Sequence, residues 1–545
     1  MADEADAVVI GSGPNGLVAA NILADHGWRV VVQEAEEVPG GAVRSDRGVH
    51  PDFVNDLFSS FHPLAAASPV VGALDLHEFG LQWSHAPAVL AHPLADGRCA
   101  VLRRGVEATV AGLAHDFGAE DAEGWTRLSA LWQRLDPHLV NALLAPFPPL
   151  RSGSALARRL GVADGLRFAR MMALPVRRLG EEEFSDIGAT MLLAGCALHA
   201  DLLPEAVPSA AFGWLLAMLG QQHGWPAPVG GAGALTDALV GRLESKGGVV
   251  RCGSRVTSVV VRGGTALGVR TADGDAVRAR RAVLADVAAP ALYGGLVSWD
   301  DLPVRLRDDM RRFHWDLGTF KVDWALDGPI PWTAPGAGQA GTVHLAGDLG
   351  ELSDYAVQVA TGRLPALPFL LLGQMTTTDP TRSPAGTESA WAYTHVPRHV
   401  TEDLGGQLAG RWDRAEAQAY ADRLEARVET FAPGFRSRIR SRRILSPHTL
   451  ETEDENLVGG ALNGGTAGVH QQLVFRPVPG SGRARTPVRR MFLASASAHP
   501  GGGVHGACGA NAARAALHAD RLGVGRTALR VATGRRSPRA DADDR

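Results

Sequence analysis

The sequence has few of the residues that form redox pairs or metal sites. Only four of its 545 residues are cysteines, and they lie far apart, at Cys99, Cys196, Cys252 and Cys508. Because no C-x-x-C pair exists, the cysteines exclude a dithiol redox centre and a cysteine zinc site, and they do not suit a secreted disulfide scaffold. We therefore predict no metal site and a reducing compartment.

Lysine and net positive charge are also scarce. Lys246 and Lys321 are the only lysines, so almost all of the 54 basic residues are arginines. The formal net charge is −4 and the sequence pI is about 6.6. A chain of this charge lacks the basic surface that nucleic acid requires, so no nucleic-acid partner is expected.

Long hydrophobic runs are missing as well. The longest, Ile187 to Ala200 and Ala206 to Gly220, are roughly 15 residues each, below the ~20 needed to cross a bilayer. We interpret them as core helices, with a substrate-tunnel wall or a peripheral membrane face as the alternatives. The acidic start, MADEAD, leaves no room for a secretory leader, so we expect a cytoplasmic protein and leave peripheral membrane contact open.

The chain begins with a dinucleotide-binding pattern. Ala7 to Ile10 predict a short buried strand, Gly11, Gly13 and Gly16 form a G-x-G-x-x-G turn, and apolar residues then recur at helical spacing. A second predicted strand ends at Glu34. Strand, glycine turn, helix and terminal acid in this order predict a βαβ unit that binds a dinucleotide.

Positions in this unit have separate physical roles. Gly11 permits the tight turn, Gly13 lets the backbone approach a pyrophosphate, and Gly16 lets helix and strand pack closely. The phosphates are expected at the helix N-terminus, where free N–H groups favour anions. Glu34 can accept hydrogen bonds from ribose hydroxyls, and its charge would repel the 2′-phosphate of NADP. The residues predicted to contact the cofactor here are Gly11, Gly13, Pro14, Asn15, Gly16, Glu34 and Ala35.

A glycine doublet follows this unit directly. The stretch PGGAVRS, Pro39 to Ser45, lets backbone run close to a second face of the pyrophosphate. It resembles the GGxxxS/T motif of the FAD-dependent amine oxidase and phytoene desaturase superfamily, although Val38 stands where that family often has an arginine. The resemblance implies FAD as the cofactor. The contacts expected from this stretch are Gly40, Gly41, Ala42 and Arg44.

A second stretch looks like a further part of the FAD domain. After Pro228, a helix with leucines on one face leads into three predicted strands. These strands are expected at Val256 to Val261, Ala266 to Arg270 and Val277 to Ala285. The resemblance implies that Val256 meets the adenine through its backbone.

The third stretch, Met491 to Leu517, has a strand, a glycine-rich turn and an alanine-rich helix. Its G-x-G-x-x-G at Gly501, Gly503 and Gly506 is not interpreted as another dinucleotide site, because no strand ending in an acid follows. We expect the helix to begin at Gly503 and Val504, with its N-terminus at the flavin ring, where the dipole stabilises the anion of reduced flavin. The cofactor contacts expected here are Ser495, Gly502, Gly503 and Val504.

Together these stretches predict an α/β fold, in which a Rossmann-like FAD-binding domain is interleaved with an α+β substrate domain. The FAD-binding domain is expected at residues 1–62, 225–300 and 480–524, the substrate domain at 63–224 and 301–479, and a disordered tail at 525–545. Within the substrate domain we expect a loop from Ala86 to Pro93.

Two side chains are candidates for the chemistry. Lys321 shares one face of a predicted strand with Asp323, so it either forms an ion pair or places a cation near flavin N5. His505 falls in the predicted first turn of the last helix. It either accepts a proton or orients substrate beside the cofactor, or it faces solvent or the second domain.

Further stretches such as LVFRPVP and AHPGGGVHGA narrow the resemblance to the phytoene dehydrogenase-related group of this superfamily. The resemblance implies an FAD-dependent oxidoreductase of the desaturase/dehydrogenase type. It would move a hydride from an apolar or amphipathic substrate to flavin N5, with reoxidation by O2, a quinone or another acceptor. A flavin-dependent isomerase, an amine oxidase and a non-catalytic FAD-containing regulator or scaffold are the alternatives, and a homo-oligomer is left open.

Overall fold

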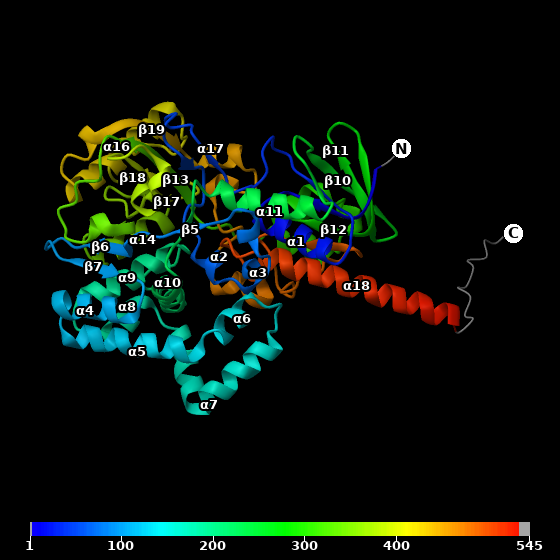
Figure 1. Cartoon of the computed structure of the whole chain (residues 1–545), viewed down its shortest axis with the longest axis horizontal. Helices are drawn as coiled ribbons and strands as arrows, with labels where there is room; N and C mark the ends of the chain where they lie inside the picture. Colours follow the sequence, from blue (N-terminus) through cyan, green and yellow to red (C-terminus); the bar gives the residue numbers. More distant parts are fainter. Residues whose placement is uncertain (1–2, 533–545) are drawn as a thin grey trace.

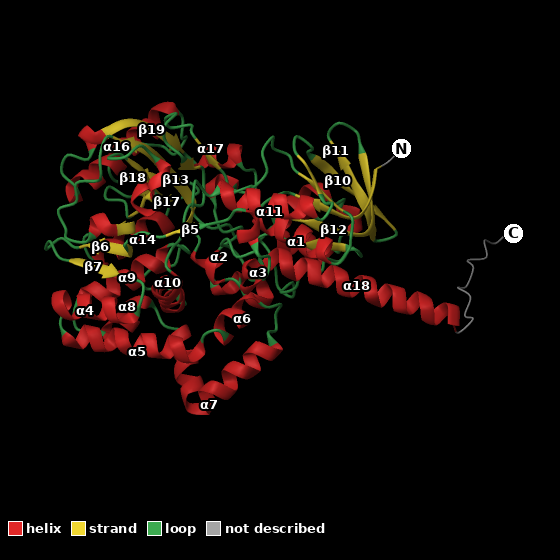
Figure 2. Ribbon diagram, viewed as in Figure 1, coloured by secondary structure: helices red, strands yellow, loops and turns green. Residues whose placement is uncertain are grey.

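The computed structural model describes residues 3–532. Two seven-stranded sheets lie at opposite ends of the molecule (Figure 1). The strands of the first sheet come from the beginning, the middle and the end of the chain. Figure 1 shows the green strands β10, β11 and β12 of this sheet near the N-terminus. Most of the helices below the second sheet come from residues 106–223 (Figure 2).

The first sheet has the strand order β10-β11-β12-β1-β2-β9, and β20 also pairs with β12. Strands β9, β2, β1, β12 and β20 run parallel, whereas β10 and β11 are antiparallel. Their bounds are β1 (Asp3–Ile10), β2 (Val30–Gln33), β9 (Val249–Arg251), β10 (Val256–Arg262), β11 (Thr265–Thr271), β12 (Ala276–Ala285) and β20 (Met491–Leu493). This parallel core with its helices confirms the predicted α/β fold, and the three strands expected from Val256 onward are present.

Three helices cover one face of the first sheet. They are α1 (Pro14–Asp25), α11 (Gly233–Ser245) and α18 (Ala507–Ala532), and their apolar side chains form one buried cluster with those of β1, β2 and β12. Helices α1 and α18 approach so closely that a Cβ at Gly509 would lie 1.9 Å from the carbonyl oxygen of Asn15. The small alanine and glycine side chains of α18 therefore allow this helix to pack closely against the start of α1, next to the G-x-G-x-x-G turn.

The second sheet has the order β19-β13-β17-β16-β14-β6-β7. Its strands are β6 (Ala88–Pro93), β7 (Cys99–Leu102), β13 (Gly318–Leu326), β14 (Ala340–Leu345), β16 (Leu370–Gln374), β17 (Glu388–Val396) and β19 (Ile439–Leu445). One face is apolar and packs on α16 (Arg414–Phe431), with Phe320, Val322 and Trp324 in that core. The opposite face carries polar side chains, which the alternation of β13 predicted for Lys321 and Asp323.

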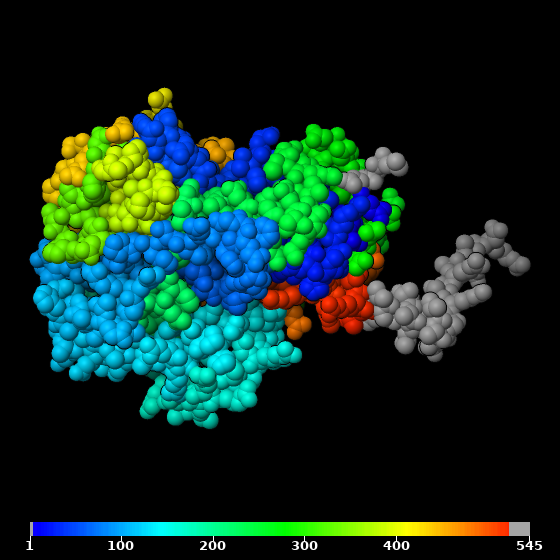
Figure 3. Space-filling view, viewed as in Figure 1, coloured from blue at the N-terminus to red at the C-terminus, as the bar shows by residue number. Residues whose placement is uncertain are grey.

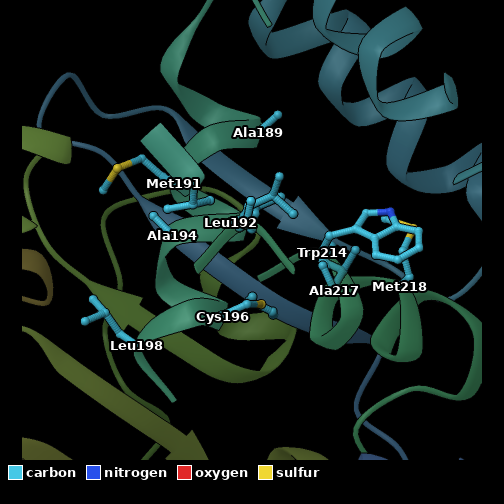
Figure 4. Packing of buried hydrophobic residues seen from close by; sticks show 14 of the residues in the cluster. Ala189, Met191, Leu192, Ala194, Cys196, Leu198, Trp214, Ala217 and Met218 are labelled. Atoms are coloured by element: carbon cyan, nitrogen blue, oxygen red, sulfur yellow. The ribbon is translucent and has the colours of Figure 1, made fainter. Parts of the chain in front are cut away.

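A helical layer packs against the second sheet. It consists of α4 (Val106–Phe117), α5 (Ala119–Leu135), α6 (His138–Leu144), α7 (Leu150–Met172), α8 (Val176–Glu183), α9 (Ile187–Leu198) and α10 (Ser209–His223). Figure 4 shows Met191 and Leu192 of α9 in the same core as Trp214 and Met218 of α10. The two long apolar runs are thus core helices, and because Cys196 of the first and Leu216 of the second also line a cavity, the core-helix and tunnel-wall interpretations of these runs are not exclusive. Among the helices of residues 3–532, none has the length and apolar character needed to cross a membrane.

Shorter elements connect these layers. They are β3 (Ser45–Asp46), β4 (Asn55–Asp56), β5 (Trp83–Ser84), β8 (Ala227–Pro228), β15 (Arg363–Leu364), β18 (Glu402–Asp403), α2 (Pro63–Ala67), α3 (Pro69–Gly72), α12 (Ala289–Ala291), α13 (Val304–Met310), α14 (Leu349–Ala360), α15 (Met375–Thr378) and α17 (Pro447–Glu453).

Three local expectations need correction or restriction. The loop expected from Ala86 to Pro93 is wrong, because residues 88–93 form the fully buried strand β6. The alanines and His92 of this segment are not typical of a strand. The last helix begins at Ala507, not at Gly503, because Gly503 and Gly506 have φ angles of 106° and 68°, which a right-handed helix does not permit. The tail expected at 525–545 overlaps α18, which continues to Ala532, and residues 533–545 lie outside the described part of the chain.

Buried charges connect the first part of the chain to the second sheet. Asp56, at the end of β4, forms an ion pair with Arg382 at 3.0 Å, and Arg382 pairs with Asp379 at 3.0 Å. The backbone oxygen of Asp56 accepts a hydrogen bond from Lys321 of β13 at 2.7 Å. Arg443 of β19 in turn bonds Asp323 of β13. All of these carboxylates and Arg382 are at most 1% exposed. The network is therefore a buried ionic contact that joins segments far apart in the sequence.

We expect Arg382→Met to destabilise the protein by about 3–5 kcal/mol, because it leaves Asp56 and Asp379 as buried carboxylates without their shared cation. The free energy of unfolding from denaturant titration checks this. The control is Arg305→Met, which removes an 85% exposed arginine that lies 3.8 Å from Asp309 and is expected to change stability by less than about 1 kcal/mol. Equal effects of the two substitutions would contradict the importance of the buried network.

Candidate active site

A cavity of about 1140 Å³ is lined by residues of both sheets and of the helical layer. One end lies at the carboxyl ends of β1, β2 and β12, where parallel sheets with crossover helices bind their ligands. The other end lies against the polar face of the second sheet and against α6, α7, α9 and α10. Its volume is above the usual range of single small-molecule sites, about 300–1,000 Å³, which suits two ligands placed end to end.

The cavity brings together almost all of the residues predicted from the sequence. Those that line it are Gly11, Gly13, Pro14, Asn15, Glu34, Ala35, Gly41, Ala42, Arg44, Val256, Lys321, Ser495, Gly502, Gly503, Val504 and His505. Gly16 and Gly40 lie just behind its wall. A Cβ at Gly16 would lie 2.3 Å from the carbonyl oxygen of Gly11, so this glycine serves close packing, as predicted.

The glycine turn and the glycine doublet form a backbone cradle. Gly11 has a φ of 90°, and a Cβ at Gly41 would lie 3.1 Å from the Cα of Gly13. A Cβ at Gly11 would lie 2.7 Å from the carbonyl oxygen of Asp286, and one at Gly13 would lie 2.8 Å from its Oδ2, so glycine lets the turn, the doublet and Asp286 pack closely and leaves the backbone bare. The absence of side chains therefore fits the approach of a pyrophosphate to the N-terminus of α1.

Glu34 connects the turn to the segment after β2. Its Oε2 accepts hydrogen bonds from the backbone N–H of Ser12 at 2.7 Å and from the Ser12 hydroxyl at 2.5 Å. Its Oε1 accepts one from the backbone N–H of Glu36 at 3.0 Å. The Ser12 hydroxyl oxygen also accepts a hydrogen bond from the N–H of Gly40 at 3.2 Å. Through Ser12, Glu34 thus holds the G-x-G-x-x-G turn against the glycine doublet, and it also lines the cavity.

Asp286, which the sequence analysis missed, lies at the nucleotide end. It follows β12, and its Oδ2 accepts a hydrogen bond from the backbone N–H of Gly16 at 2.6 Å, in the first turn of α1. Burial raises the pKa of this carboxyl to about 8, and the negative charges of Asp454 and Glu34 act in the same direction. The available sequence signal was an acid at the end of an apolar strand, but only the fold places that strand beside β1.

Several buried polar atoms on the cavity wall have no hydrogen-bond partner among the described residues. At the nucleotide end these are Asn15 Oδ1 and both amide atoms of Gln33, and in the middle they are Ser60 Oγ and His62 Nδ1. Buried polar atoms without partners are costly, so their concentration on one wall fits a ligand rich in hydrogen-bonding groups. Together with the cradle, they fit FAD.

His505 precedes α18 and is only 2% exposed. Its Nδ1 accepts a hydrogen bond from the N–H of Ala507 at 3.0 Å. Burial lowers the pKa of His505 to about 4, although the carbonyls of Gly501 and Gly502 oppose this shift. The neutral ring therefore carries its proton on Nε2, and its Nδ1 lone pair is engaged.

Lys321 lies deeper, on the second sheet. It forms the ion pair with Asp323 that its position on β13 predicted, and it donates a hydrogen bond to the backbone oxygen of Asp56. Burial lowers the pKa of the Lys321 ammonium, whereas the charge of Asp323 raises it. The Lys321 side chain also lines the cavity. It therefore forms the ion pair with Asp323 and at the same time places a charged group on the cavity wall.

The end of the cavity beyond Lys321 is mostly apolar. Helices α6, α7 and α10 contribute aliphatic and aromatic side chains, among them Leu139, Val140, Leu144, Phe168, Met172, Phe212 and Leu216. The second sheet contributes Trp391 and Tyr393 from β17. This end can enclose an apolar molecule.

Comparison with known proteins gives relatives over nearly the whole length. Residues 15–517 match the family of flavin containing amine oxidoreductases. The chain is 28% identical to pyridine nucleotide-disulfide oxidoreductase domain-containing protein 2 of Mus musculus, over 94% of this chain and 93% of that protein. It is 25% identical to a neurosporene-forming phytoene desaturase of Cereibacter sphaeroides, over 95% and 96% of the two chains.

A solved structure has a similar fold. An oxidoreductase from Methanosarcina mazei superposes with a TM-score of 0.59 at 15% sequence identity, over 94% of this chain and 99% of that one. The matched region begins at residue 15, after β1 and the turn glycines Gly11 and Gly13, and it contains the glycine doublet and all the other strands of the two sheets. The protein is therefore an FAD-dependent oxidoreductase that belongs to the flavin containing amine oxidoreductase family.

Proposed function

We propose that this enzyme is a dehydrogenase or desaturase that oxidises an apolar or amphipathic small molecule. The observation that carries the proposal is the continuity of one cavity, from the glycine cradle at the end of β1 to the apolar space under α6, α7 and α10. Bound FAD would accept a hydride at N5 and be reoxidised by O2, a quinone or another acceptor. The residues of the apolar end would exclude water and align the bond that is oxidised.

The proposed cofactor contacts follow the wall of the cavity. Gly11, Gly13, Pro14 and Asn15 would hold the pyrophosphate at α1, with Gly16 behind them, and Gly40, Gly41, Ala42 and Arg44 would form its second face. Glu34 and Ala35 would meet the ribose, and Val256 the adenine. Ser495, Gly502, Gly503 and Val504 would lie at the flavin end. Asp286 would face the same pyrophosphate in its protonated form.

The proposed division into domains follows the two sheets. Residues 1–62, 225–300 and 480–524 would form the FAD-binding domain, and residues 63–224 and 301–479 the substrate domain. The support is that the first group supplies every strand of the first sheet, and the second group every strand of the second.

An apolar substrate is supported by the lining and by a relative. The phytoene desaturase relative is named for a hydrocarbon substrate. Carboxylates that could pair with an ammonium line the nucleotide end, at Glu34, Glu36, Asp286, Glu453, Asp454 and Glu455, and among the described lining residues none lies at the apolar end. This distribution favours a dehydrogenase over an amine oxidase.

Peripheral contact with a membrane is also part of the proposal. Helix α7 carries Leu150, Val162 and Leu166, which are 75%, 83% and 68% exposed. The cyan residues of α5 to α7 form the lower edge of the molecule in the space-filling view (Figure 3). Helix α7 is kinked at Gly161, and Phe168 and Met172, on the same side of the kink as Val162 and Leu166, line the apolar end of the cavity, so a substrate dissolved in lipid would have a short route. A cytoplasmic location and a homo-oligomer stay predictions.

We expect the purified protein to contain FAD and its flavin to be bleached without oxygen by members of a library of apolar alcohols, ketones and polyenes. Absorbance of oxidised flavin and mass spectrometry of the products measure this. NADPH is expected to reduce the flavin slowly or not at all, because the chain has one complete dinucleotide unit. Bleaching by amines alone would contradict the proposal in favour of an amine oxidase. A product of unchanged mass would indicate an isomerase.

We expect FAD to bind about tenfold more weakly at pH 9 than at pH 7, because Asp286 loses its proton as the pH rises through about 8. Its charge would then repel the pyrophosphate. Burial raises the pKa of Asp454 to about 6, so Asp454 ionises below this window. Asp286→Asn should keep the dissociation constant of FAD constant from pH 7 to 9.

Fluorescence titration of FAD at each pH measures this effect, with Asp237→Asn, an exposed carboxylate on α11, as the control. The control should keep the fall in affinity that the unchanged protein shows. A fall of the same size in Asp286→Asn would contradict the assignment.

We further propose that His505 and Lys321 act next to the reacting atoms, His505 by orienting substrate or cofactor and Lys321 as a fixed cation. His505→Ala is expected to retain FAD and to slow substrate-dependent flavin reduction at least ~100-fold. In the unchanged enzyme, His505 should add no inflection between pH 5 and 9, because its pKa is about 4. Stopped-flow reduction across this pH range measures both effects. Near-normal reduction in the variant would remove His505 from the mechanism.

A further inference from the structure

Three polar side chains lie together in the apolar end of the cavity. Tyr393 of β17 and His344 of β14 lie on the same face of the second sheet, on one rung in which Leu371 of β16 stands between them. His199, which follows α9, reaches this rung from the helical layer. Tyr393 and His199 line the cavity, and His344 is fully buried behind them.

These side chains form a hydrogen-bonded chain that leads to the cavity. The Nε2 atoms of His199 and His344 are 2.9 Å apart, so one of them donates a proton to the other. The hydroxyl oxygen of Tyr393 is 3.4 Å from Nδ1 of His199. Burial lowers the pKa of His199 to about 3 and that of His344 well below its usual value, so both rings are neutral.

The direction of the chain follows from one unpaired atom. Nδ1 of His344 is buried and has no hydrogen-bond partner among the described residues. A buried acceptor without a partner is tolerated better than a buried donor, so His344 carries its proton on Nε2 and donates it to His199. His199 then carries its own proton on Nδ1 and donates it to the Tyr393 oxygen. The hydroxyl proton of Tyr393 is left without an acceptor in the described structure.

Other unpaired groups lie around the same space. Thr342 lies two residues before His344 on β14, so it shares the same face of the sheet. Its Oγ1 and the Nε1 of Trp225 are buried, line the cavity and have no partner among the described residues. The ring of Trp225 contacts that of His199 edge-on, at 5.1 Å between centroids. Among residues 3–532, no group of three or more His, Cys, Asp or Glu side chains could hold a metal ion.

We propose that the substrate carries a neutral oxygen, as an alcohol, ether or ketone, which accepts a hydrogen bond from Tyr393 at the sheet end of the cavity. His199 and His344 are positioning residues that fix the direction of this donor. This inference rests on the proposed function, which identifies the occupant of the apolar end as the substrate. It narrows the proposed substrates from apolar molecules in general to apolar molecules that carry an oxygen atom. An ammonium group is disfavoured because the described carboxylates of the cavity wall lie at the nucleotide end. Lys321, the cation that the second sheet presents to the cavity, is already paired with Asp323 and is therefore not free to pair with a substrate carboxylate.

The test uses equilibrium dialysis of the FAD-loaded protein with three probes of one chain length: farnesol, farnesene and farnesylamine. Bound probe is quantified by mass spectrometry. We expect farnesol to bind at least about tenfold more tightly than farnesene, because the hydrocarbon leaves buried polar groups without partners. In Tyr393→Phe this preference should fall to within about twofold, while binding of farnesene stays unchanged. His199→Leu should reduce the preference in the same direction.

The matched control is Tyr355→Phe. Tyr355 is also buried and hydrogen-bonded, to Thr394 and to the backbone of His395, but it does not line the cavity. This control should keep the preference for farnesol. Equal binding of farnesol and farnesene to the unchanged protein, or a preference that survives Tyr393→Phe, would overturn the proposal, and tightest binding of farnesylamine would overturn it in favour of an amine ligand.

With oxygen and other electron acceptors excluded from the dialysis, each flavin can be reduced at most once, so binding is measured without sustained turnover and the two proposals can fail separately. Flavin that no apolar compound bleaches, with the farnesol preference intact, would contradict the dehydrogenase function alone. Rapid bleaching by hydrocarbons, with no preference for farnesol, would contradict the oxygen subsite alone. FAD content, read from absorbance, is checked in every variant so that a loss of fold is recognised.

Discussion

The buried charges around Asp56 are the constraint on which the site depends. Asp56 follows the glycine doublet, yet it pairs with Arg382 and accepts a hydrogen bond from Lys321, both of which belong to the second half of the chain. Its Oδ1 also accepts a hydrogen bond from the N–H of Ala232, just before α11. Because buried ionic groups tolerate little displacement, this joint fixes the spacing between the two sheets. The cavity between the glycine cradle and the polar face of the second sheet depends on this spacing.

The nucleotide half was largely predictable because its signals are local. A glycine turn followed by a helix has one common structural solution, and Gly11, Gly13 and Glu34 lie in the cavity as their spacing implied. Asp286 could not be found in this way. It reaches Gly16 only because β12 enters the sheet next to β1, although 270 residues separate the bonded pair. The start of α18 was misplaced for a different reason, since the φ angles of Gly503 and Gly506 are determined by the packed turn.

The substrate half was less predictable because its chemistry depends on register. Alternation along β13 correctly placed Lys321 beside Asp323, a relation within one strand. Tyr393 and His344 come together across β17, β16 and β14, and His199 joins them from a helix, so no segment of sequence contains the group. The strand β6 was missed because Val89 is its one β-branched residue, and its two alanines, His92 and Pro93 are not typical of strands.

The helical layer enters the chain as one continuous stretch, from α4 to α10, between β7 and β8. It forms one wall of the apolar end, whereas the opposite wall is sheet and the cradle lies elsewhere. A change of length or sequence in α6 and α7 would therefore remodel the ligand space without touching the glycine turn or the ion pairs of Asp56. Evolution of new substrate preference in this architecture can proceed by exchange of this single chain segment, provided that the contacts at the end of α6 are kept, where the Leu144 carbonyl accepts a hydrogen bond from Asn511 of α18.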